Sequence, residues 1–198
     1  MGKEKHLRKI EELFEKSPVV SYSSIERIIN DRRKTEYAKQ LVRNLILKGK
    51  IKKLAKGFYT IHDNPQLSIF CFKPSYFGLQ DALSFHNLWE QETIPIVITT
   101  RKIRQGLRSI LGVNVLVRRI NKRYFFGFEY LPQDEGYVPY SDIEKTFIDM
   151  VYFKERLSDE AIKNITEKID GKKLNSYLKK YPKNIRKRVL NQLKVRVY

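Results

Sequence analysis

The chain has 198 residues, of which 40 are Lys or Arg and 22 are Asp or Glu, so its formal net charge is +18. Its 41% hydrophobic residues, including 11 Phe and 12 Tyr, suffice for one or two small folded domains and argue against a disordered chain. The N-terminus is charged, no apolar run approaches roughly 18 residues, and Cys71 is the single cysteine, so a secretory signal, a membrane span and a disulfide framework are not expected. We therefore expect a cytoplasmic protein with no segment that spans a membrane.

The positive charge is concentrated at the two ends of the chain. Residues 1–63 contain 16 basic and 8 acidic residues, residues 64–156 contain 12 and 10, and residues 157–198 contain 12 and 4. Clustered Lys and Arg usually meet a polyanion. Nucleic acid is the first candidate partner and an anionic membrane surface the second, while a solvated basic surface without a partner is the alternative.

Helical spacing of apolar residues predicts three helices near the N-terminus. The first covers residues 4–16. The second is expected to begin at a capping box formed by Ser23 and Glu26. The third is predicted from about Thr35 to Lys48, with Gly49 placed to end it.

Two short segments, 51–54 and 58–61, follow the third helix and flank a turn that ends at Gly57, which predicts a β-hairpin. Helix, capped helix, long helix and hairpin follow one another in the order typical of a winged helix-turn-helix. The sequence therefore predicts a winged helix-turn-helix DNA-binding domain in residues 1–63.

The outward face of the third helix, the residues before it and the hairpin tip hold the candidate DNA-binding side chains. Arg can read guanine and Gln can read adenine, whereas Lys senses phosphates without reading sequence. We therefore assign base reading to Gln40 and Arg43. A solvated, lysine-rich helix face is the alternative. The candidate DNA-binding residues are Arg32, Arg33, Lys34, Thr35, Lys39, Gln40, Arg43, Lys53 and Lys56.

Residues 64–198 are predicted to form a mixed α/β domain with an antiparallel sheet and C-terminal basic helices, which places the whole chain in the α+β class. Helices are expected to begin at Ser75, at a second capping box of Ser141 and Glu144, and at Ser158. Aromatic and β-branched content predicts strands at 67–72, 94–99, 113–117 and 124–128.

The C-terminal helices are rich in Lys and Arg but carry no specific motif. These cations could extend a DNA footprint, contact RNA or bind an acidic protein, and a solvated surface explains them equally well. A protein-binding module is therefore an open alternative for this end of the chain.

Little in the sequence points to catalysis. The three His and Cys71 do not show metal-ligand spacing, and no glycine-rich phosphate motif is present. We expect no catalytic residue, no metal and no cofactor. The alternative is a nuclease that is targeted by the winged helix and uses Mg²⁺ at Asp142, Glu144 and Asp149 beside Lys145. Helix capping and the helix dipole explain the first two carboxylates better than a metal site does.

Several stretches, taken in order, resemble one family of regulators. They are Tyr37–Val42, Gly49–Lys53, Gly57–Tyr59, Ser75–Leu83, His86–Leu88 and Val138–Asp149. They are similar to the AbiEi-like antitoxins of type IV toxin–antitoxin (abortive infection) systems, although this chain has Ser75-Tyr76 where the family often shows Ser-His. The resemblance implies a winged-helix domain that represses its own operon and a C-terminal domain that counteracts a nucleotidyltransferase-like toxin. The expected partners are double-stranded operator DNA and such a toxin, and a palindromic operator would place a dimer on the DNA.

Overall fold

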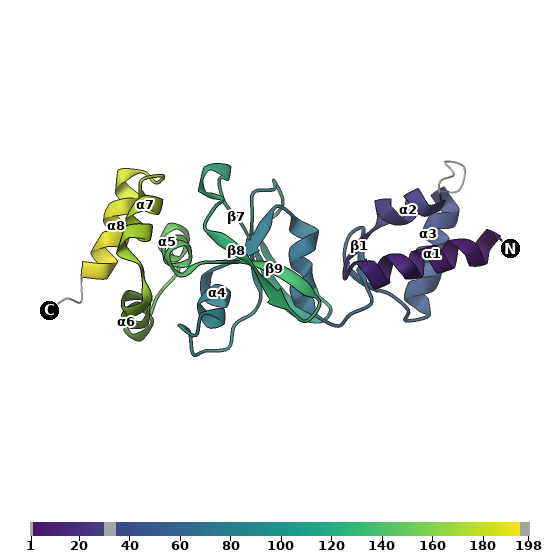
Figure 1. Ribbon diagram of the computed structural model, residues 1–198, viewed down its shortest axis with the longest axis horizontal. Coiled ribbons are helices and arrows are strands. Elements are labelled where there is room, and N and C mark those ends of the chain that lie inside the picture. The colour runs from purple at the N-terminus through teal and green to yellow at the C-terminus, as the bar shows by residue number, and fades with distance from the viewer. Residues whose placement is uncertain (1, 30–34, 195–198) are drawn as a thin grey trace. The chain divides into compact units, whose positions relative to one another are not determined.

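The computed structural model describes residues 2–29 and 35–194, and these residues confirm the predicted α+β class (Figure 1). The chain divides into two compact units. The first comprises residues 1–71 together with 109–113, and the second comprises residues 72–108 together with 114–198. In the described part of the chain, no helix combines the length and the apolar character that crossing a bilayer requires.

The first unit consists of three helices and a small antiparallel sheet. Its sheet has the strand order β1-β3-β2, in which Val20 and Lys53 both lie opposite Tyr59. Apolar residues from all three helices, including Ile10, Ile25 and Val42, form one buried core against this sheet. The predicted first and third helices and the hairpin are confirmed. The elements are α1 (Gly2–Lys16), β1 (Val20–Ser21), α2 (Tyr22–Ile29), α3 (Thr35–Leu47), β2 (Lys52–Ala55) and β3 (Phe58–Thr60).

The start of α2 differs from the prediction. The hydroxyl of Ser21, not that of Ser23, accepts a hydrogen bond from the backbone N–H of Ser24 at 3.1 Å. The helix begins early because the N–H of Tyr22 donates to the carbonyl of Gly57 at 2.8 Å, which fixes the end of β1 against the hairpin. The capping box predicted from Ser23 and Glu26 is therefore wrong, and Ser21 has the capping role.

The end of α3 follows the prediction closely. Gly49 has a φ of +67°, and its N–H donates to the carbonyl of Ile46 at 2.9 Å. The N–H of Lys50 donates to the carbonyl of Leu45, also at 2.9 Å. This pair of hydrogen bonds is a Schellman motif, in which glycine adopts the left-handed conformation without a steric cost. The motif ends α3 and directs the chain into β2.

The larger sheet has six strands in the order β6-β7-β5-β4-β9-β8. The pairs β4–β5 and β8–β9 are antiparallel, but β5–β7 and β4–β9 are parallel. The predicted antiparallel sheet is therefore confirmed only in part: the sheet is mixed, because two strands pair in parallel with partners that are distant in sequence. The strands are β4 (Ser75–Phe77), β5 (Ile96–Thr99), β6 (Gly106–Ile110), β7 (Val113–Arg119), β8 (Phe128–Gln133) and β9 (Gly136–Ser141).

Two segments predicted as strands form 3-10 helices or loops instead. Residues 67–72 lie in η2 (Pro65–Phe72), which begins where Asn64 Oδ1 accepts from the N–H of Gln66 at 2.9 Å. Of the predicted strand 124–128, Tyr124 ends η3 (Lys122–Tyr124), which Asn121 caps, and only Phe128 lies in a strand, as the first residue of β8. The other apolar side chains of the two segments are buried or half-buried without belonging to a strand, so aromatic content alone misassigned them.

The helix α4 (Leu79–Phe85) begins later than predicted. Ser75 lies in β4 opposite Thr99, so it does not cap a helix. The N-cap is Gly78, where an added Cβ would lie 2.5 Å from Cδ1 of Ile98. A larger residue at this position would have to displace the buried Ile98 side chain, so the packing of the helix start against β5 favours glycine.

The remaining helices cluster beside the sheet in the second unit (Figure 1). Ser158 caps the second of them by accepting from the N–H of Ala161 at 3.1 Å, as predicted. The predicted cap Ser141 is wrong, because this residue ends β9 and Asp142 accepts from the N–H of Lys145 at 2.8 Å. These helices are α5 (Ile143–Phe153), α6 (Asp159–Lys168), α7 (Gly171–Leu178) and α8 (Lys183–Lys194).

Candidate nucleic-acid interface

The outward face of α3 is defined by what the helix buries on its other side. Ala38, Val42 and Leu45 are almost fully buried in the core of the first unit. With 3.6 residues per turn, this leaves the opposite side of the helix in solvent. The exposed residues on that side include Lys39, Gln40, Arg43 and Asn44.

Hydrogen bonds along this face arrange its polar side chains. Lys39 Nζ donates to Glu36 Oε1 at 2.7 Å, and this hydrogen bond to a carboxylate raises the pKa of the Lys39 ammonium. One turn further along, Gln40 Nε2 donates to Asn44 Oδ1 at 3.1 Å. Among the described residues, this pairing leaves the Gln40 carbonyl and the Arg43 guanidinium for an external partner.

Asn44 is a candidate that sequence reasoning missed. Its side chain lies four residues after Gln40, which is the spacing that brings side chains together on a helix surface. This spacing was visible in the sequence, but only the structure shows that the two amides are hydrogen-bonded. An Asn–Gln pair presents both donors and acceptors, the groups that base edges offer in a DNA groove.

The hairpin carries the remaining described candidates. Lys53 lies in β2 and Lys56 in the turn before Gly57, and both side chains are exposed. Lys52 is ion-paired with Asp63, whereas within residues 2–29 and 35–194 neither Lys53 nor Lys56 forms an ion pair. The hairpin therefore presents two cations whose charge no carboxylate of the described residues neutralises.

The structure brings together only part of the predicted set. Lys39, Gln40 and Arg43 share one face of α3, while the hairpin turn that follows Lys56 contacts the start of α2 through the Gly57 carbonyl. Thr35 is the first residue of α3, but its side chain lies outside the described part of the chain. Arg32, Arg33 and Lys34 lie entirely outside the described residues.

The carboxylates proposed for the alternative nuclease do not share one site. Asp149 has no exposed surface and is ion-paired with Lys145, which is also fully buried. The hydroxyl of Tyr76 donates to Asp149 Oδ2 at 2.7 Å. Burial raises the pKa of the Asp149 carboxyl and lowers that of the Lys145 ammonium, and their mutual attraction opposes both shifts.

Asp142 and Glu144 instead form contacts that connect the start of α5 to α7. Lys173 Nζ lies 3.2 Å from Asp142 Oδ2 and 3.2 Å from Glu144 Oε2. Glu144 Oε1 also accepts from the backbone N–H of Asp170 at 2.8 Å. Within the described residues, no group of three His, Cys, Asp or Glu side chains is arranged to hold a metal ion.

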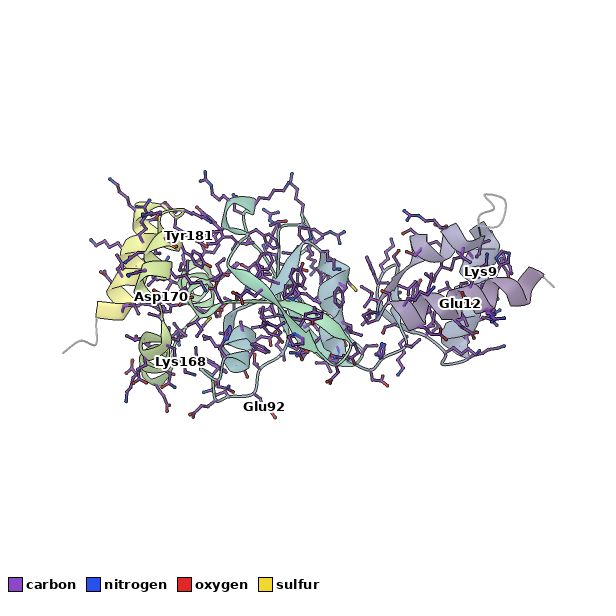
Figure 2. All side chains as sticks on the ribbon, viewed as in Figure 1. Lys9, Glu12, Glu92, Lys168, Asp170 and Tyr181 are labelled. Atoms are coloured by element: carbon purple, nitrogen blue, oxygen red, sulfur yellow. The ribbon has the colours of Figure 1, made fainter. Side chains whose placement is uncertain are left out.

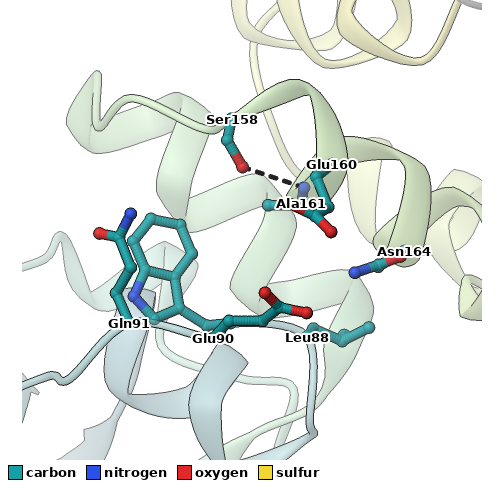
Figure 3. A pocket seen from close by; sticks show the side chains of 8 residues that line it. Leu88, Glu90, Gln91, Ser158, Glu160, Ala161 and Asn164 are labelled. Carbon is teal, nitrogen blue, oxygen red and sulfur yellow. Dashed lines mark hydrogen bonds between the residues drawn. The ribbon is translucent and has the colours of Figure 1, made fainter.

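A small pocket lies between the chain after α4 and the start of α6 (Figure 3). Leu88 and Trp89 form one side, and Ala161 forms part of the other. Glu90 and Glu160 both line it, and the Ser158 hydroxyl there is engaged in capping α6. Its volume of about 80 Å³ is well below the roughly 300 Å³ of a typical small-molecule site.

Comparison with known proteins supports the fold but not a function. The chain is similar to the crystal structure of the RV2827C protein from Mycobacterium tuberculosis, with a TM-score of 0.60. The two sequences are 12% identical, and the match covers 90% of this chain and 72% of that one. No protein-family model matches the chain, and no curated protein matches its sequence.

Proposed function

We propose that the chain is a DNA-binding transcriptional regulator that reads duplex DNA through a winged helix-turn-helix. In this proposal α2 and α3 form the helix-turn-helix, α3 enters the major groove, and the β2–β3 hairpin is the wing. The observation that carries the proposal is the exposed face of α3, where Lys39, Gln40 and Arg43 lie opposite a buried apolar side.

The side chains of this unit suit two separate roles on DNA, phosphate contact and base reading. Lys39, Lys53 and Lys56 are exposed cations on α3 and the hairpin, and lysines neutralise phosphates without reading sequence. Gln40 and Arg43 have the side chains that form bidentate contacts with adenine and guanine. Electrostatics would supply affinity, and the α3 side chains would supply specificity.

The particular regulator that the sequence resembles is an AbiEi-like antitoxin that represses its own operon. On this proposal the second unit counteracts a nucleotidyltransferase-like toxin, and neither role requires a catalytic residue, a metal or a cofactor. Co-expression with the product of an adjacent nucleotidyltransferase gene tests the antitoxin role. Rescue of growth supports that role, and continued growth arrest contradicts it.

Substitutions on α3 are expected to relax base preference. Gln40→Ala or Arg43→Ala should each cost roughly 1–3 kcal/mol on the preferred duplex and much less on a scrambled one, because a bidentate base contact is lost. Fluorescence anisotropy with a duplex selected from a random library measures both affinities. Lys163→Ala, at an exposed position on α6, is the matched control and should change neither affinity. Equal losses on both duplexes would show that α3 does not read bases.

A further inference from the structure

Two long segments of the chain contain no acidic residue. Residues 93–128 lie between Glu92 and Glu129, and they contain eight Lys or Arg but no Asp or Glu. Residues 171–198 likewise contain ten Lys or Arg and no Asp or Glu. Segments of one charge sign repel each other, so their approach in the fold needs a cause.

Aromatic rings bring the two segments together in the second unit. The ring of Tyr124 stacks on that of Tyr181, with centroids 4.2 Å apart and planes inclined by 9°. Lys180 Nζ lies 3.8 Å from the centroid of the Phe126 ring. Figure 2 shows Tyr181 at the junction between α7 and α8. The packing of these rings therefore places the η3 segment beside the α7–α8 junction.

Some cations at this junction donate hydrogen bonds to the backbone, and others form no ion pair with any described residue. Arg186 Nε donates to the carbonyl of Tyr181 at 2.7 Å, and Arg188 Nη2 donates to the carbonyl of Val151 at 2.9 Å. The other cations are exposed, and in the described part of the chain they form no ion pair. They are Lys122, Arg123, Lys179, Lys180 and Lys183, here called the junction surface.

The composition of the junction surface favours phosphates over a protein partner. Protein–protein interfaces are depleted in Lys and enriched in exposed aromatic anchors. Here the two stacked rings are buried, because Tyr124 is 7% exposed and Tyr181 is 1% exposed, and the half-buried Phe126 ring lies under Lys180. Buried rings also cannot stack with the bases of a single strand, as single-strand binders require. What the surface offers is a cluster of unpaired cations, which suits the paired backbones of a duplex.

We propose that the junction surface is a second nucleic-acid-binding surface, which contacts the phosphates of duplex DNA without reading sequence. It belongs to the second unit and does not depend on whether α3 binds DNA. Its cations come from the η3 segment and from the α7–α8 junction.

The test removes charge from the junction surface in the full chain. The variant Lys122→Gln/Lys179→Gln/Lys183→Gln keeps Arg123 and Lys180, whose side chains lie over aromatic rings. Binding to a random-sequence duplex is measured by anisotropy over a salt series. The slope of log K against log salt should become shallower by about 3, because three phosphate contacts are lost at about 0.9 each. The matched control Arg156→Gln/Lys163→Gln/Lys168→Gln removes equal charge from other exposed positions and should leave the slope unchanged.

The same measurement in a second background separates this surface from α3. In the variant Arg43→Ala/Lys53→Ala/Lys56→Ala, salt-dependent duplex binding should persist and should fall when the three junction lysines are also replaced. If Arg43→Ala/Lys53→Ala/Lys56→Ala alone abolishes duplex binding, the proposal for the junction surface is refuted while the α3 proposal stands. If only the junction substitutions change binding, the α3 proposal fails and this one stands. Tighter binding to single-stranded DNA, to polyglutamate or to phosphatidylserine vesicles than to duplex would also overturn it.

Discussion

Asp149→Ala is expected to destabilise the second unit by about 3–5 kcal/mol. The substitution leaves the Lys145 ammonium fully buried without its counter-charge, and it removes the acceptor of the Tyr76 hydroxyl. An unpaired charge in a low-dielectric core is among the largest costs that a single substitution can impose. Urea denaturation followed by circular dichroism measures the loss in the free energy of unfolding.

Two further variants separate the charge from the packing. Lys145→Met/Asp149→Leu removes both charges and should recover most of the stability that Asp149→Ala loses, since replacing both partners of a buried pair is often neutral. Asp149→Asn keeps an acceptor for Tyr76 and should fall between the two. A free energy of unfolding for Asp149→Ala within about 0.5 kcal/mol of the unsubstituted chain, the range of an ordinary surface change, would contradict the buried pair.

The same buried pair sets how the nuclease alternative must be tested. Because Asp149→Ala should perturb folding, loss of cleavage in that variant would not identify a metal ligand. Glu144→Gln, assayed with Mg²⁺ on duplex and single-stranded DNA, is more informative, because Gln keeps an oxygen that can accept from the Asp170 N–H. Cleavage by the unsubstituted chain that Glu144→Gln abolishes without loss of stability would favour a nuclease over a regulator.

The stability of the second unit is expected to fall as the pH rises from about 4 to about 7, because of Asp81. Burial raises the pKa of this carboxyl from 3.8 to about 7, while a hydrogen bond from the Ile96 N–H, at 2.9 Å, works in the opposite direction. The folded state therefore retains a proton that the unfolded chain releases above its own pKa. Stability is fully present below the unfolded pKa and is lost as the pH rises through the folded one.

The expected loss attributable to Asp81 is at most about 4 kcal/mol, at about 1.4 kcal/mol for each pKa unit. The free energy of unfolding, measured in urea at several pH values across this interval, gives the slope. Asp81→Asn should flatten it, because an amide does not titrate. Asp134→Asn, at an exposed position in the β8–β9 turn, is the control and should leave the slope unchanged. An identical slope in Asp81→Asn and the unsubstituted chain would contradict the prediction.

Local patterns in the sequence were sufficient for α1, α3 and the β2–β3 hairpin of the first unit. The helical periodicity of α1 and α3, the glycine stop at Gly49 and the hairpin around Gly57 all depend on neighbouring residues. The cap of α2 was misassigned because it depends on β1 pairing with β3, which is a contact with a distant segment. For the same reason the predicted cap of α5 was wrong, and Asp142 rather than Ser141 caps this helix.

Contacts between distant segments also explain what could not be predicted in the second unit. The parallel pairing of β5 with β7 and of β4 with β9 joins strands that the chain reaches by crossovers. Lys145 and Asp149 have the spacing of an ordinary exposed ion pair on a helix, and nothing in the sequence indicates that α5 is buried on that side. The two segments without acidic residues can be identified in the sequence, but the Tyr124–Tyr181 stacking that joins them cannot.

The salt dependence of duplex binding by the full chain tests the proposed interface of α3 and the hairpin most directly. If about 6 phosphates are neutralised, log K should fall against log salt with a slope near −5, and Lys53→Ala/Lys56→Ala should make that slope shallower by about 2 for every duplex sequence. Lys163→Ala/Lys168→Ala, which removes equal charge from α6, should not change it. Failure to bind any duplex at low salt, or an unchanged slope in the hairpin variant, would contradict the account.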